Sequence, residues 1–387
     1  MKMASIPVLD LSWANVPDWK PKLLDQLRAA LFEVGFLYIV NHGVDSNIIE
    51  ALTDRLPDLF ALPDEQKAAL SKLNSPHFLG YSGFAEETTL GKQDLREQFD
   101  FATELPVVYN EFEDTAAANG AASQRDFRKL YWRLRGPNQW PLENSVPGFR
   151  TAFTNYHDAV QELSYRFVHL VEEAVGIPIG TFDHFFGLAN SQSASTEDES
   201  RLRKFLPPQH RIKLLRYPPS QDDTSAGQGV GAHKDSSGWL TFLYQVGEEA
   251  GLEVMSASGD WLPASPIPNS FVVNFGNAFD AATEGAVKAT IHRVISPGPN
   301  SDVRYSIPFF QGLPLDMTVS EVRSYIPDEV KRRRKESGTW HDETSSFLDP
   351  RWDSLGESQL RKWIRSHRNV ATKWYGKEVV DYYVAAE

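Results

Sequence analysis

The strongest chemical signal in the sequence is a group of imidazole and carboxylate side chains that suits a metal ion. Among ten histidines, only His233 begins a His-x-Asp pattern, which Asp235 completes. In an extended strand, residues i and i+2 point to the same face, so both side chains could bind one ion while Lys234 points away. His292, on a later predicted strand, supplies a third ligand. Two histidines and one carboxylate that leave open coordination positions are typical of non-haem Fe(II) sites that react with O₂.

A second motif follows the third proposed ligand and suits a carboxylate. Arg304 and Ser306 form the only Arg-x-Ser in the chain. On a strand their side chains share one face, where a guanidinium fork and a hydroxyl donor could hold a carboxylate together. The intervening residues 296–302 are rich in turn formers, so the strands that carry His292 and Arg304 are predicted to pair as an antiparallel hairpin.

Composition restricts what kind of metal site is possible. The 387 residues include no cysteine, which excludes disulfides, thiolate nucleophiles, iron–sulfur clusters and cysteine-ligated zinc. Lys and Arg total 39 against 52 for Asp and Glu, a net charge of −13. This balance argues against a broad nucleic-acid surface and against a polybasic membrane patch. Because neither a signal peptide nor an apolar run of membrane-spanning length is present, we expect a cytoplasmic protein.

The two motifs fall in a block that is predicted to be all β. Residues from about 210 to 312 consist of short apolar runs separated by Gly, Pro, Asn and Asp, which is typical of a sandwich or barrel. The predicted strands of this block lie at 212–217, 239–246, 271–275, 290–295 and 304–310. From about Leu315 onward the sequence turns polar and is predicted to be helical.

The region before this block is predicted to surround it. Strands are expected at 6–11 and 36–40, and helices at 23–34, at 45–60 with Asp45 as N-cap, and at 149–175. Pro57 could shorten or kink the second helix, and Gly176 ends the third. Two polar stretches, 111–124 and 190–204, are predicted loops.

A second candidate metal motif lies near the C-terminus. His341-Asp342-Glu343 is a His-x-Glu, and His367 follows downstream. This segment is polar and predicted to be helix or coil, in which residues i and i+2 do not face each other. We therefore predict surface histidines here and not a metal site.

These motifs resemble the isopenicillin N synthase-like branch of Fe(II)/2-oxoglutarate-dependent oxygenases. The resemblance extends from about Ile6 to Gln311. Its marks are IPVLDLS (6–12), GFLYIVNHGV (35–44), RYPP (216–219), HKD (233–235), VVNFG (272–276), HRV (292–294) and RYS (304–306). Two positions depart from the family pattern, since Leu215 replaces an asparagine and Asn277 replaces an aspartate.

The resemblance implies a fold and a role for each site residue. The fold would be mainly β with flanking helices around a double-stranded β-helix (jelly-roll) core. A single integrated domain would comprise an N-terminal region (1–205), the core (206–312) and a C-terminal helical extension (313–387). The implied metal ligands are His233, Asp235 and His292. Arg304, Ser306 and Tyr217 would hold 2-oxoglutarate, and Phe310 would line the substrate pocket.

The implied activity is oxidation of a small organic molecule, such as a specialised metabolite, with Fe(II), 2-oxoglutarate and O₂. Hydroxylation, desaturation or ring closure would use the same residues. Three alternatives remain open at this point. Arg304 and Ser306 could bind the substrate's own carboxylate in a 2-oxoglutarate-independent oxidase of isopenicillin N synthase type. The scaffold could instead be a non-catalytic binding protein, or the metal could be zinc in a hydrolase.

Overall fold

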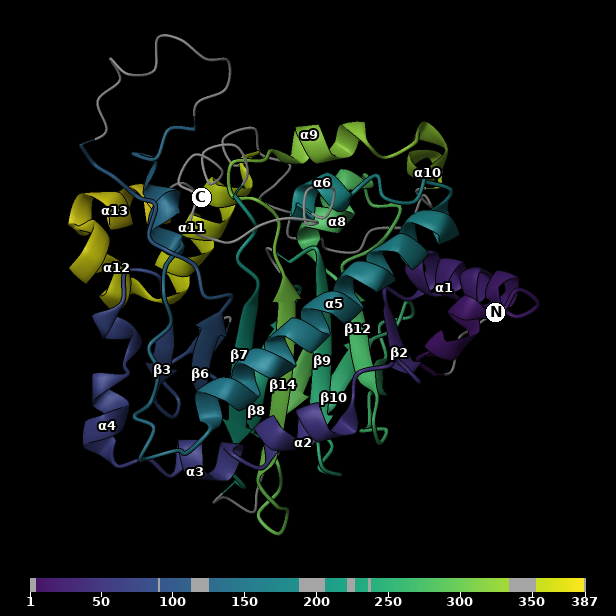
Figure 1. Ribbon diagram of the computed structural model, residues 1–387. Coiled ribbons are helices and arrows are strands. Elements are labelled where there is room, and N and C mark those ends of the chain that lie inside the picture. Colours follow the sequence, from purple (N-terminus) through teal and green to yellow (C-terminus); the bar gives the residue numbers. More distant parts are fainter. Residues whose placement is uncertain are drawn as a thin grey trace.

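The computed structural model describes residues 5–89, 91–112, 125–187, 206–220, 227–235, 238–333 and 353–385. Two sheets form its centre (Figure 1). The major sheet has the strand order β1 (Val8–Asp10), β2 (Phe36–Val40), β12 (Phe271–Phe275), β9 (Leu240–Val246), β14 (Arg304–Gln311), β7 (Arg211–Tyr217), β6 (Glu97–Ala102), β3 (Gly80–Ser82). The minor sheet has the order β11 (Trp261–Pro263), β10 (Leu252–Met255), β13 (His292–Ile295), β8 (Gln228–His233). A small ribbon pairs β4 (Thr88–Thr89) with β5 (Lys92–Gln93).

Helices surround the sheets on the outside. The longest, α5 (Phe149–Val175), crosses the outer face of the major sheet (Figure 1). The N-terminal helices are α1 (Lys20–Glu33), α2 (Ser46–Thr53), α3 (Leu56–Phe60) and α4 (Asp64–Ala69). The others are α6 (Asp183–Phe186), α8 (Asn277–Ala282), α9 (Val319–Ser324), α10 (Asp328–Arg332), α11 (Leu355–Ser366), α12 (Arg368–Tyr375) and α13 (Lys377–Ala385). No helix in the described ranges has the length and apolar character needed to span a bilayer.

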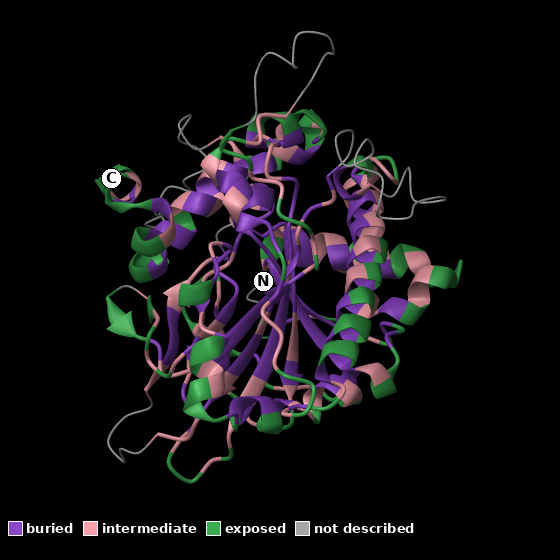
Figure 2. Ribbon diagram, turned by 60° about the vertical axis from the view of Figure 1, so that its left-hand side comes forward, coloured by how far each residue is buried: buried purple, intermediate pink, exposed green. Residues whose placement is uncertain are grey.

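Central strands of the major sheet, such as β7, have one apolar and one more polar face. On β7, Ile212 and Leu214 pack into the core beneath α5, whereas Arg211 and Lys213 line a cavity on the opposite face. This alternation follows from the two-residue period of a strand. Figure 2 shows the strands as the most buried part of the molecule, with exposed residues on the outer sides of the helices. The apolar faces therefore hold the sheet to α5 and leave the inner face available for function.

Several predictions from the sequence are confirmed and others are wrong. Strands 36–40 and 271–275, the Asp45 N-cap and the termination of α5 at Gly176 are as predicted. The helix predicted at 45–60 is helical over most of its length but divides into α2 and α3 near Pro57, the residue that was expected to shorten or kink it. The loop predicted at 190–204 lies outside the described residues, as do residues 113–124 of the loop predicted at 111–124.

The predicted hairpin between the strands of His292 and Arg304 is wrong. β13 pairs with β10 and β8 in the minor sheet, whereas β14 pairs with β7 and β9 in the major sheet. The connection between them crosses from one sheet to the other. A jelly roll moves its chain between two sheets in this way, so strands that follow each other in sequence need not be neighbours in a sheet.

The close approach of two backbone segments generates a test of this fold. A Cβ atom on Gly276 would lie 1.9 Å from the carbonyl oxygen of Gly238, so only glycine fits. We expect Gly276→Ala to lower the free energy of unfolding by about 2 kcal/mol or more, measured by urea denaturation. Gly298→Ala is the matched control, since its Cβ would meet only Ser301 Oγ at 3.9 Å. Equal stability of the two variants would contradict this packing.

Candidate functional site

A cavity of about 370 Å³ opens between the two sheets. Its lining comes from the major sheet, the minor sheet and α11, so segments far apart in the sequence meet here. All seven residues predicted as site residues line this one cavity: Tyr217, His233, Asp235, His292, Arg304, Ser306 and Phe310. The structure therefore brings together every residue that the sequence motifs selected.

Three side chains converge at the inner wall of the cavity. His233 ends β8 and lies directly opposite His292 on β13. Asp235 follows two residues after His233, just past the strand end. Its Oδ1 lies 3.8 Å from His233 Nε2 and 3.6 Å from His292 Nε2. One ligand atom from each residue lies within 4.8 Å of the others, a spacing that could accommodate a metal ion between them.

Hydrogen bonds on the far side of each ring select the nitrogen that faces this point. His233 Nδ1 donates to the carbonyl of Gly231 at 2.8 Å, and His292 Nδ1 donates to that of Thr290 at 3.1 Å. With Nδ1 protonated, a neutral imidazole has its lone pair on Nε2, as a metal ligand requires. Both rings are thus held in the tautomer that suits coordination.

Asp235 is fixed in the same manner. Its Oδ2 accepts hydrogen bonds of 2.7 Å from Thr241 Oγ1 and from Asn274 Nδ2. Oδ1 is left to face the two histidines. Sequence motifs did not single out Thr241 and Asn274, although Asn274 lies inside the VVNFG stretch and its polar side chain in an apolar run was a usable signal.

Burial and mutual charge set the protonation states. Burial lowers the pKa of His233 to about 3, and the facing His292 acts in the same direction. Burial alone would raise the pKa of the Asp235 carboxyl. The two histidines and the hydrogen bonds from Asn274 and Thr241 outweigh burial and lower that pKa to about 2. His233 is therefore neutral and Asp235 ionised at neutral pH, the forms that bind metal.

A buried cation lies in another part of the cavity. Arg304 is 0% exposed, and its guanidinium forms no ion pair with any residue in the described ranges. Its Nη2 donates to Gln245 Oε1 at 3.0 Å and its Nη1 to Ser306 Oγ at 3.5 Å, while Nε has no hydrogen-bond partner there. The guanidinium carbon lies 5.0 Å from the Tyr217 ring centroid. Because burying an unpaired charge is costly, this geometry suits an anionic ligand.

Comparison with known proteins identifies the family. A model described as the N-terminal region of non-haem dioxygenases in morphine synthesis matches residues 6–143, and one for the 2OG-Fe(II) oxygenase superfamily matches residues 208–312. The chain is 37% identical to 2-oxoglutarate-dependent dioxygenase frbJ of Dothideomycetidae sp. (strain 11243), across 97% of this chain and 93% of that protein. The chain belongs to the 2OG-Fe(II) oxygenase superfamily.

Other similar proteins agree with this identification. A 2-oxoglutarate-dependent dioxygenase of Gibberella zeae is 30% identical over 96% of this chain and 91% of its own length. A full-length Neurospora crassa protein, solved in complex with alpha-KG and 5-formyluracil, has the same fold, with a TM-score of 0.63 and 22% identity over 92% of this chain and 95% of that one. A 2OG-Fe(II) oxygenase family protein from Caulobacter crescentus also has a TM-score of 0.63, with 24% identity over 90% of this chain and 99% of that one.

Membership of the superfamily confirms the class of chemistry predicted from the motifs. The protein is an Fe(II)/2-oxoglutarate-dependent dioxygenase with a jelly-roll core. The 2-oxoglutarate-independent oxidase, the non-catalytic binding protein and the zinc hydrolase are not supported. Asn277, which departs from the family pattern, begins α8 and donates its backbone N–H to the Asp235 carbonyl at 2.8 Å. A main-chain group makes this contact, so an aspartate is not required for it.

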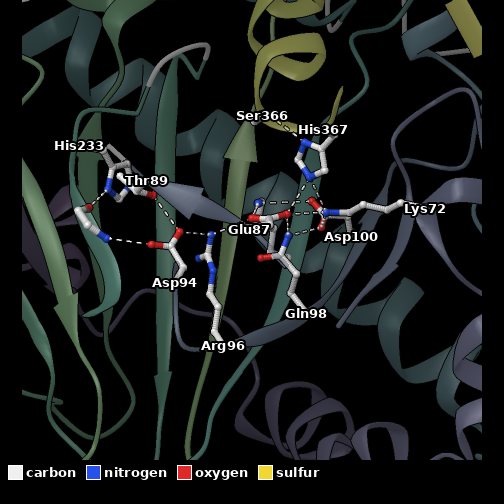
Figure 3. Close-up of polar contacts among 12 residues, drawn as sticks. Lys72, Glu87, Thr89, Asp94, Arg96, Gln98, Asp100, His233, Ser366 and His367 are labelled. Atoms are coloured by element: carbon white, nitrogen blue, oxygen red, sulfur yellow. Dashed lines mark hydrogen bonds and ion pairs between the residues drawn. The ribbon is translucent and has the colours of Figure 1, made fainter. Parts of the chain in front are cut away.

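Of the second candidate metal motif near the C-terminus, only His367 lies within the described residues. His341 lies outside the described residues. The prediction that His367 is a surface histidine is wrong, because it is 8% exposed and its Nε2 lies 2.7 Å from Glu87 Oε1 (Figure 3). The helical pattern of residues 355–366 gave no sign that α11 would pack onto the cavity and place this ring beside a buried carboxylate.

The bonds to Asp235 generate a prediction about metal affinity. We expect Thr241→Val, which keeps the side-chain shape but removes the hydroxyl, to weaken Mn(II) binding about tenfold or more, because Oδ2 loses a bond that orients the carboxylate. Equilibrium dialysis of the purified protein measures this. Thr154→Val on the exposed side of α5 is the control, since its hydroxyl contacts only the Arg150 carbonyl. Unchanged affinity in Thr241→Val would show that this bond does not orient the ligand.

Proposed function

We propose that His233, Asp235 and His292 hold Fe(II) in this oxygenase. The main support is that the other polar atom of each side chain already forms a hydrogen bond within the protein. The nitrogen atoms Nε2 of the two histidines and Oδ1 of Asp235 are therefore left to face one point. Two imidazoles and one carboxylate suit Fe(II) and leave coordination positions open for other ligands. With Fe(II) and 2-oxoglutarate bound, the site would supply oxidising chemistry in which O₂ is the oxidant and 2-oxoglutarate is converted to succinate and CO₂.

Arg304, Ser306 and Tyr217 are proposed to bind the distal carboxylate of 2-oxoglutarate. The guanidinium offers a buried positive charge with an unused donor, and Ser306 Oγ lies beside it. Leu215, directly across from Ser306 on β7, adds an apolar wall. A carboxylate paired in such surroundings interacts strongly, because little water screens the charge.

The proposed substrate is a small organic molecule of the specialised-metabolite class, and hydroxylation is the proposed reaction. A cavity of about 370 Å³ is of the size that binds small molecules. Structural neighbours support this size class, because the Neurospora crassa protein has been crystallised with thymine and with 5-formyluracil. Phe310 lines the cavity, whereas Phe309 points into the core, so Phe310 is the proposed substrate contact. Desaturation or ring closure would require the same metal and co-substrate residues.

Turnover of the co-substrate tests the assignment of the metal ligands. Protein reconstituted anaerobically with Fe(II) and then given O₂ and 2-oxoglutarate should form succinate, and a substrate panel should stimulate it. His233→Ala and His292→Ala should abolish that turnover and weaken Mn(II) binding, while their far-UV circular dichroism stays native. Native rates in either variant would remove that histidine from the metal site.

The role of Arg304 leads to a separate prediction. Millimolar 2-oxoglutarate should raise the melting temperature of the Mn(II)-loaded wild type by mass action. In Arg304→Met we expect this rise to disappear, because affinity should fall roughly a hundredfold or more when a buried charge partner is lost. Arg293→Met is the control, since Arg293 pairs with Glu253 across β13 and β10 and does not line the cavity. A retained thermal shift in Arg304→Met would place 2-oxoglutarate elsewhere.

A further inference from the structure

The wall of the cavity formed by α11 is rich in cations. The Trp363 ring centroid lies 4.5 Å from the guanidinium carbon of Arg211, 5.7 Å from Lys213 Nζ and 6.0 Å from Lys72 Nζ. Lys362 precedes Trp363 on the same helix and also lines the cavity. None of these residues belongs to the proposed iron and 2-oxoglutarate sites, so their charge requires another explanation.

Nearby carboxylates neutralise part of this charge. Lys72 Nζ lies 2.8 Å from Glu87 Oε1 and 2.6 Å from Asp100 Oδ2, and Lys213 Nζ lies 3.7 Å from both carboxylates. Arg96 bridges Glu87 at 3.0 Å and Asp94 at 3.7 Å (Figure 3). Three acidic groups thus face three basic ones, and this network is balanced.

Arg211 and Lys362 do not belong to this network of paired charges. Within the described ranges, Arg211 donates only to backbone carbonyls, those of His77, Leu134 and Phe78 at 2.8, 3.1 and 3.4 Å. Lys362 forms neither a hydrogen bond nor an ion pair with the described part of the chain. His367 adds no charge, because burial lowers its pKa. The described cavity wall therefore carries an excess of positive charge.

Lys362 carries a positive charge at neutral pH, although its surroundings disfavour the protonated form. Loss of hydration on the cavity wall, together with the neighbouring Lys213, lowers the pKa of Lys362 to about 8. Asp235 and Glu87 act in the opposite direction but do not cancel this shift. The side chain nonetheless stays accessible from the cavity. An accessible ammonium without a partner among the described residues can bind an anion without first breaking an ion pair in this part of the chain.

Strand register places this wall beside the proposed iron site. Asn274, Thr241, Phe310 and Arg211 lie side by side on β12, β9, β14 and β7. The first two hold Asp235. Arg211 lies two strands beyond Thr241, roughly 10 Å away at the usual inter-strand spacing. Phe310 lies between them, so one small molecule could contact Phe310 while reaching both the iron site and the cationic wall.

We propose that the substrate carries an acidic group, in the simplest case a carboxylate, that binds to Lys362 beside Arg211 and Trp363. This proposal rests on the proposed function and names the substrate class of the same site. Lys362 supplies the direct ionic contact, and Arg211 adds positive potential while its donors hold the surrounding backbone. The acidic group fixes one end of the molecule, so that an unactivated carbon at the other end is presented to the iron site.

A cationic substrate group fits this wall less well. The carboxylates that could attract it, Glu87, Asp94 and Asp100, are already paired with Lys72, Arg96 and Lys213. An incoming ammonium would have to displace one of these buried partners. A carboxylate meets the Lys362 ammonium, which has no partner among the residues that the structure describes, so charge favours the acid.

Binding without turnover tests the proposal. Protein loaded with Mn(II) and 2-oxoglutarate is titrated by calorimetry with matched carboxylates, primary amides and amines built on phenyl, indolyl and linear alkyl skeletons. We expect the carboxylate to bind about tenfold or more tightly than its amide in at least one series, and the amine to bind most weakly. Wild-type protein that binds no carboxylate at millimolar concentration, or prefers amides or amines in every series, overturns the proposal.

Variants of α11 locate the site. Lys362→Met should reduce the preference for carboxylate over amide to near unity, and Lys362→Arg should retain most of it. Lys373→Met on the exposed side of α12 is the control and should bind like wild type. An unchanged preference in Lys362→Met overturns the assignment. Affinity for 2-oxoglutarate is measured in the same samples, so failure of this proposal is distinguished from failure of the co-substrate site, which Arg304→Met tests.

Discussion

The alternation of side chains along the strands of the major sheet is the constraint on which the rest of the structure depends. Every second residue packs beneath α5, so the intervening residues must face the minor sheet. Core packing on one face therefore fixes the direction of Thr241, Asn274, Arg304 and Arg211 on the other. A shift of one residue in any strand would exchange apolar and functional side chains. The positions of the side chains in the site thus depend on the packing of the outer face of the sheet.

Charge compensation is the second organising feature, because the inner face carries many ionisable groups in little water. Most are matched in pairs or networks, such as Lys72 with Glu87 and Asp100. In the described ranges, Arg304, Arg211 and Lys362 are the exceptions, and Arg304 lies at the opposite end of the β14–β7 pairing from Arg211. Unmatched charge marks where a ligand completes the structure. Arg304 corresponds to the carboxylate proposed for the co-substrate, and Lys362 beside Arg211 corresponds to the one proposed for the substrate.

Much of this site was predictable from sequence because its central residues form short motifs at strand spacing. Arg304 with Ser306 needed only the two-residue period, whereas Asp235 lies just past the end of β8 and was identified by the His-x-Asp motif itself. The pairing of the strands was not predictable in the same way, and the expected hairpin between β13 and β14 is wrong because the connection crosses between sheets. Residues that act through a neighbour, such as Thr241, have no spacing rule that identifies them. The burial of His367 depends on how α11 docks, a tertiary contact that local pattern does not encode.

The bond between His367 and Glu87 joins residues 280 positions apart. Because α11 lies C-terminal to every strand of the two sheets, it can complete the cavity only after all of those strands have been synthesised. Until then the inner wall presents Glu87, Asp100, Lys72 and Lys213 to water. An unfinished molecule also exposes Phe78, Tyr131, Trp132 and Leu134, the apolar residues on which the C-terminal helices pack. Docking of α11 therefore buries an apolar cluster in the same step that closes the charged wall of the cavity.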